Sequence, residues 1–72
     1  MAATINQAKK ALEKKFPGYT ATYIETKPSG NYYFQLTEYV DDHRNTLDWF
    51  TVNPKTGKYT TDFGTYTGTL TF

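Results

Sequence analysis

Residues 32–53 read YYFQLTEYVDDHRNTLDWFTVN, and this stretch decides the fold. Bulky apolar and polar side chains alternate along it with a period of two, which predicts strands over 32–40 and 46–53 joined by a turn over 41–45. One face of the pair holds Tyr32, Phe34, Leu36, Val40, Phe50 and Val52. The opposite face holds Tyr33, Gln35, Thr37, Tyr39, Leu47, Trp49 and Thr51. We expect the even-numbered face to form the core and the odd-numbered face to point away from it.

The segment before this pair predicts a helix over residues 4–16. Thr4 and Gln7 have the spacing of a capping box, in which each side chain accepts a bond from an orphan backbone N–H. The helix should end at Phe16, because a residue that precedes proline is disfavoured in the helical conformation. Its apolar stripe consists of Ile5, Ala8, Leu12 and Phe16. The lysines off this stripe are Lys9, Lys10, Lys14 and Lys15, and we interpret them as the solvated face.

The rest of the chain predicts further strands. Residues 19–26 alternate in the same way, and Asn53–Lys58 places proline and glycine as a tight hairpin turn requires. Residues 58–61 then form the returning strand, and residues 64–72 are a candidate for a short last one. We therefore expect a single α+β domain over 1–72, with an N-terminal helix packed on an antiparallel sheet of four hairpin-linked strands, or five if the tail joins.

Composition restricts the classes of function. The chain has 72 residues, a net charge of +1 and no cysteine, which excludes disulfides, thiolate metal sites and thiol nucleophiles. A charge so close to zero argues against binding to nucleic acid through its phosphates. No apolar run approaches the roughly 20 residues of a membrane helix. The 14 threonines and 13 aromatic residues favour strands, with aromatic rings supplying much of the core.

The candidate catalytic and metal-binding residues are weak. His43 with Asp41 and Asp42 lies on one predicted turn, where three neighbours do not easily converge on a metal. Ser29 lies in a turn with no base near it. The remaining acidic candidates for a glycosidase pair are Glu38, Asp48 and Asp62, and a helix on one sheet offers them no deep cleft. We therefore expect no enzyme activity, no cofactor and no metal.

The odd-numbered face carries the main binding hypothesis. Tyr33, Tyr39 and Trp49 should lie on it, and exposed aromatic rings offer a large contact area at low entropic cost. The alternative is that these rings pack on one another as cross-strand pairs, or that residues 64–72 cover them.

The order of elements resembles the PepSY domain family. The resemblance is carried by Ala8, Ala11, Leu12 and Lys15-Phe16-Pro17-Gly18, then by Tyr32–Leu36 and by Trp49–Lys58. This last run is similar to a family strand ending in Val-Asp-x-x-Thr-Gly. Asn53 stands here in place of that aspartate. The likeness covers about residues 4–62.

This resemblance implies an α+β module of bacterial secreted proteins or lipoproteins that binds or inhibits peptidases or acts as an accessory domain, with no catalytic residues to carry over. It implies an extracellular or cell-surface location, although Met1-Ala2-Ala3 leads into the helix without a signal segment. The chain is then either a cytosolic protein or a domain excised from a longer chain. We favour the excised domain and expect a protein or peptide partner. The alternative is a structural spacer or a self-associating domain.

Overall fold

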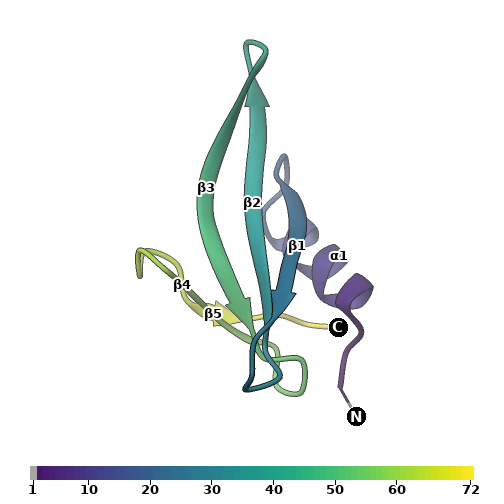
Figure 1. Cartoon of the computed structure of the whole chain (residues 1–72). Coiled ribbons are helices and arrows are strands. Elements are labelled where there is room, and N and C mark those ends of the chain that lie inside the picture. Colours follow the sequence, from purple (N-terminus) through teal and green to yellow (C-terminus); the bar gives the residue numbers. More distant parts are fainter. Residues whose placement is uncertain (1) are drawn as a thin grey trace.

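The computed structural model describes residues 2–72 and has one helix packed on one face of a five-stranded antiparallel sheet (Figure 1). The elements are α1 (Ile5–Lys15), β1 (Thr20–Thr26), β2 (Tyr32–Val40), β3 (His43–Val52), β4 (Lys58–Thr61) and β5 (Gly68–Thr69). The strands lie side by side in chain order, β1-β2-β3-β4-β5. The predicted α+β fold is confirmed, and the tail joins the sheet as a two-residue strand. Over the described residues no helix is long and apolar enough to cross a membrane.

The two ends of α1 have the capping residues that the sequence predicts. The Gln7 backbone N–H donates to Thr4 Oγ1 at 3.1 Å, and the Thr4 N–H donates to Gln7 Oε1 at 2.8 Å, so both bonds of the capping box are present. At the other end Phe16 is the C-cap, and its N–H donates to the Leu12 carbonyl at 2.9 Å. The helix therefore begins and ends where its capping residues stand.

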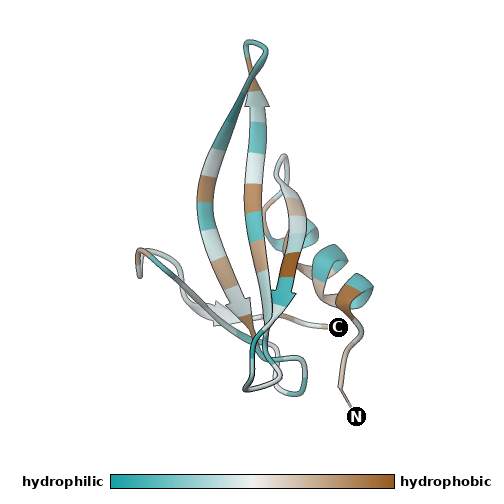
Figure 2. Cartoon of the chain, viewed as in Figure 1, coloured by the Kyte–Doolittle hydropathy of each residue, from teal (hydrophilic) through white to brown (hydrophobic). Residues whose placement is uncertain are grey.

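The core lies between α1 and the inner face of the sheet. Apolar and polar bands alternate along β2 and β3 in Figure 2, as expected for strands with only one buried face. The predicted parity holds for Phe34, Leu36, Phe50 and Val52, all of which have no exposed surface. The buried core cluster consists of Ala8, Leu12, Ala21, Phe34, Leu36, Phe50, Val52, Tyr59 and Leu70.

A β-bulge interrupts this parity in β3. Leu36 pairs with Asp48 but Thr37 pairs with Thr46, so Leu47 is an extra residue in the ladder. The prediction that Leu47 lies on the outer face is wrong, since it is partly buried and packs against the core cluster. The bulge also accompanies the burial of Thr37, which is only 5% exposed although its parity predicts the outer face.

The β2–β3 hairpin extends past the helix (Figure 1). We call its outer part, residues 38–45, the arm. Its turn contains only Asp41 and Asp42, both with positive φ (50° and 65°), as a two-residue primed turn requires. The predicted turn over 41–45 is therefore too long, because β3 already begins at His43. Val40 is predicted on the inner face, but it does not belong to the core. Its side chain is 44% exposed, because α1 does not reach the arm.

Gly57 closes the β3–β4 hairpin and lies against the tail. Its φ is +81°, its N–H donates to the Asn53 carbonyl at 2.8 Å, and its own carbonyl accepts the Leu70 N–H at 2.8 Å. A Cβ atom at this position would collide with the Leu70 carbonyl oxygen. Glycine is thus required both by the turn and by the docking of residues 68–72.

We expect Gly57→Ala to destabilise the fold by more than the cost of positive φ alone. An L-residue in this conformation costs about 1–2 kcal/mol, and here the Leu70 backbone must also move. The matched control is Gly64→Ala, because Gly64 has φ +71° and a Cβ atom added there would meet nothing within 4 Å. Urea denaturation of the two variants tests this, and equal losses of stability would contradict the steric role of Leu70.

Candidate functional site

The outer face of the sheet brings together two of the three predicted binding residues. Tyr33 in β2 pairs with Thr51, and Trp49 in β3 pairs with Gln35, so the two rings are diagonal neighbours. Both side chains are half-buried. The helix of the described chain packs on the opposite face of the sheet (Figure 1), so it does not cover them.

The segment after β4 adds two residues that the sequence analysis did not place here. The Phe63 ring meets Trp49 edge-on, with 6.1 Å between centroids, and the Tyr33 hydroxyl donates to the Asp62 carboxylate. The Asp62 N–H donates to the Trp49 carbonyl at 3.1 Å, which holds this segment beside β3. We call Tyr33, Trp49, Asp62 and Phe63 the outer aromatic patch.

Tyr33 is also covered from one side. Lys27 Nζ lies 4.4 Å from the centre of its ring, in cation–π geometry. The hydrogen bond to Asp62, burial and the neighbouring carboxylates together raise the pKa of Tyr33 to about 12. Tyr33 is therefore a neutral phenol at physiological pH, and the patch offers aromatic surface and hydrogen bonds rather than an acid or base poised near neutrality.

Tyr39, the third predicted contact residue, does not belong to the patch. It lies on the arm, six residues beyond Tyr33 in β2, or roughly 20 Å along the strand. Its ring is 69% exposed. Arg44 on β3 contacts it, with Nη2 3.0 Å from the hydroxyl oxygen and the guanidinium carbon 5.2 Å from the ring centre.

The candidate acidic residues occupy three different environments. Glu38 lies on the arm opposite Asn45, and Asp62 belongs to the outer aromatic patch. Asp48 is 1% exposed; its Oδ1 accepts bonds from the Trp49 and Phe63 N–H groups at 2.7 and 3.4 Å, while Oδ2 has no partner among the described residues. Asp48 thus fixes the segment that carries Phe63.

His43 is exposed on the arm, next to the turn formed by Asp41 and Asp42. Ser29 lies in the β1–β2 turn, where its Oγ is 3.5 Å from the Asn31 N–H. Within residues 2–72, no three His, Asp or Glu side chains are grouped closely enough to hold a metal ion.

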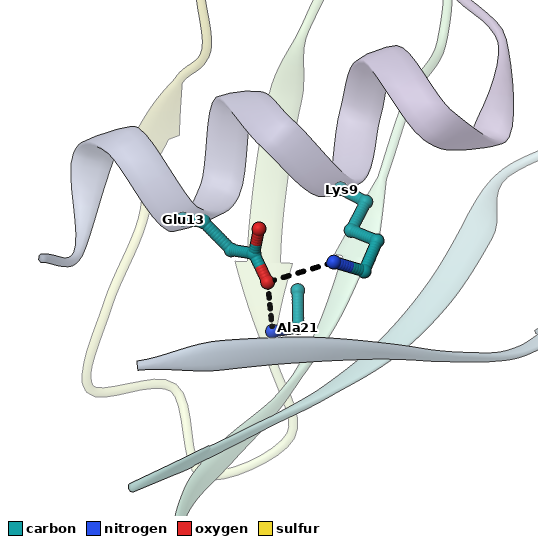
Figure 3. Close-up of polar contacts among 3 residues, drawn as sticks. All are labelled: Lys9, Glu13 and Ala21. Atoms are coloured by element: carbon teal, nitrogen blue, oxygen red, sulfur yellow. Dashed lines mark hydrogen bonds and ion pairs between the residues drawn. The ribbon is translucent and has the colours of Figure 1, made fainter. Parts of the chain in front are cut away.

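The helix bonds one backbone donor at the β1 edge of the sheet. Glu13 Oε2 accepts the Ala21 N–H at 3.0 Å and pairs with Lys9 Nζ at 2.9 Å (Figure 3). Burial acts to raise the pKa of Glu13, but the bonds from Lys9 and Ala21 outweigh it and the net pKa is lowered. A carboxylate on α1 therefore satisfies a backbone donor that an edge strand would otherwise present to another chain.

Comparison with known proteins adds no relative to this picture. No protein-family model, no curated protein and no solved structure matches the chain.

We expect Tyr33→Phe to remove a phenol that ionises unusually late. Because the folded-state pKa lies above the ordinary value of 10, the Tyr33–Asp62 bond stabilises the fold fully below pH 10 and progressively less as the pH rises toward 12. Absorbance titration at high pH, with Asp62→Asn as a second variant, measures this. The latest tyrosine ionisation should disappear in Tyr33→Phe and move to lower pH in Asp62→Asn. If it is unchanged in both variants, the assignment is contradicted.

We expect Glu13→Ala to expose the Ala21 N–H at the edge of β1. Its hydrogen exchange, followed by NMR, should accelerate severalfold, whereas Lys10→Ala should leave it unchanged. In the unmodified chain the stabilisation by Glu13 is present above the ordinary pKa of 4.5 and is lost as the pH falls through the lowered folded-state pKa. Unchanged exchange in Glu13→Ala would show that the carboxylate does not protect this edge.

Proposed function

We propose that the chain is a non-enzymatic accessory module of the PepSY-like kind, acting at a bacterial cell surface, that binds a peptidase through its outer aromatic patch. The resemblance described above motivates the class of partner and the location. The geometry of the patch supports the choice of contact surface.

One observation carries the proposal. Phe63 is 70% exposed, yet its ring is held against Trp49 and its backbone is anchored by Asp48. Phe63 and Trp49 form a pair of neighbouring rings rather than a single scattered one, and aromatic residues are enriched where partners bind. The patch is therefore preorganised for a contact.

Tyr39 supports a large partner rather than a small ligand. It presents a second exposed ring on the same strand, roughly 20 Å from Tyr33. Interfaces between folded proteins span distances of this order, with about 800 Å² buried on each partner. A peptidase surface can reach both Tyr39 and the outer aromatic patch.

The chemistry of the patch supports binding rather than catalysis. It contains aromatic rings, a tyrosine that stays neutral at physiological pH and a carboxylate bonded to that tyrosine. Such groups position a partner through packing and hydrogen bonds. Of the alternative functions, a self-associating domain would use the same aromatic rings against a second copy of the chain, whereas a spacer would not use them.

The test is a titration of thermolysin and of subtilisin with the chain, following peptidase activity and Trp49 emission. We expect one of them to bind and Phe63→Ser to weaken that binding by more than fivefold, as truncation of a contact residue worth over 1 kcal/mol would. Ile24→Ser is the matched control, because Ile24 is 44% exposed but belongs to β1.

Three outcomes would contradict the proposal. These are no response with either peptidase, an equal effect of the two substitutions, or sedimentation showing a dimer that Phe63→Ser dissociates. The last result would support self-association instead.

A further inference from the structure

The two flanks of α1 have different neighbours in the fold. On one flank Glu13 accepts a bond from the Ala21 N–H of β1. On the other flank a groove separates the helix from the C-terminal segment, residues 69–72. The helix thus lies between β1 and the C-terminal segment, and within residues 2–72 a side chain of the helix bonds a strand on the β1 side alone.

The groove between α1 and residues 69–72 has the size of a ligand site. Its volume is about 540 Å³, within the range of roughly 300–1,000 Å³ that is usual for such sites. Its residues are Ala11, Lys14 and Lys15 from α1 with Thr69, Leu70, Thr71 and Phe72. Lys10 and Gln7 line its continuation along the helix. Phe72 forms an apolar wall and is 49% exposed.

The charged side chains that line the groove are all basic. Lys10, Lys14 and Lys15 are exposed, and the only ion pair among residues 2–72 joins Lys9 to Glu13 on the other flank. No acidic side chain lines the groove. Three ammonium groups beside an apolar wall favour an occupant that carries carboxylates and apolar groups together.

The strand facing the groove has unused backbone groups. Leu70 donates its N–H to Gly57 and Gly68 pairs with Tyr59, so these two residues face β4. Because the direction of backbone groups alternates along an antiparallel strand, the N–H and C=O of Thr69 point away from β4. Thr69 lines the groove. The edge of β5 therefore offers a donor and an acceptor there.

We propose that this groove binds an extended acidic peptide segment of a partner, which adds to β5 as a further strand. Its backbone pairs with Thr69, its apolar side chains contact Phe72 and Ala11, and its carboxylates reach Lys10 and Lys14. Strand addition combines main-chain bonds for affinity with side-chain contacts for specificity. This site is separate from the outer aromatic patch, which lies on the other face of the sheet.

A peptide fits the groove better than other anionic partners. A phosphate backbone or a lipid headgroup would use the lysines but would leave the Thr69 backbone groups without partners. An acidic strand uses both the charges and the open edge.

The test uses the whole chain and an acetylated, amidated eight-residue peptide in which pairs of Glu alternate with pairs of Val, so that each face of the extended peptide carries both kinds of side chain. We expect binding that shifts the Thr69 and Thr71 amide resonances and slows exchange of the Thr69 N–H. The double variant Lys10→Glu/Lys14→Glu should bind about tenfold more weakly, through loss of two ion pairs and the repulsion that replaces them. Arg44→Glu/Lys55→Glu changes the net charge equally at two exposed positions that do not line the groove, and it should bind the peptide several times more tightly than the Lys10/Lys14 variant.

The same peptide with proline in place of one central valine tests strand addition, because proline removes a backbone N–H. We expect it to lose most of its affinity. Equal binding of the proline peptide, equal effects of the two double variants, shifts confined to β1 or to the outer aromatic patch, or no binding would each overturn the proposal. So would binding to phosphatidylglycerol vesicles but not to the peptide, which would assign the groove to lipid headgroups.

Discussion

The fold depends on how the Phe16 ring joins the end of the helix to the far half of the sheet. This ring makes edge-on contacts with Phe50, Tyr59 and Tyr66, at centroid distances of 5.2, 6.0 and 5.7 Å. Such pairs contribute about 0.5–1.5 kcal/mol each beyond the area they bury. They matter here because a chain of this size buries only about 60% of its unfolded surface. The strands β3 and β4 and the segment before β5 are thereby tied to one C-cap residue.

Both proposed binding surfaces depend on that cluster although neither contains Phe16. Phe63 and Asp62 lie between β4 and Tyr66, so their position on the outer face follows from how Tyr66 packs inside. The groove beside α1 has residues 69–72 as its far wall, and these follow shortly after Tyr66 in the chain. A small aromatic core therefore sets the geometry of two faces that do not touch each other.

Local patterns were enough to predict the architecture and the inward residues. The period of two along β2 and β3 correctly placed Phe34 and Phe50, and the capping box correctly placed the start of α1. Leu47 was misplaced because no local pattern announces a β-bulge, which depends on how the two strands pair. The predicted turn over 41–45 misses the outer end of the hairpin because Asp41 and Asp42 both adopt positive φ and close it as a two-residue turn.

The candidate sites, like the fold, are predictable from the sequence only in part. Parity placed Tyr33 and Trp49 on the outer face, but their partners Asp62 and Phe63 come from a segment whose position is decided by tertiary contacts. The lysines of α1 were visible as a basic face, while the groove beside them exists only once residues 69–72 have folded back. A sequence indicates which side chains share an element; which elements meet is decided by the core.

The β2–β3 arm has a mechanical consequence. Beyond the Leu47 bulge its pairs are held by one ladder and by surface contacts such as Tyr39–Arg44, without a helix above them (Figure 1). An unsupported ribbon of this kind unzips from its tip inward, and the opening should stop where Leu47 packs into the core. The end of the hairpin is consequently the place in the molecule where a loop can be lengthened, or a foreign epitope grafted, at the least cost to the rest of the fold.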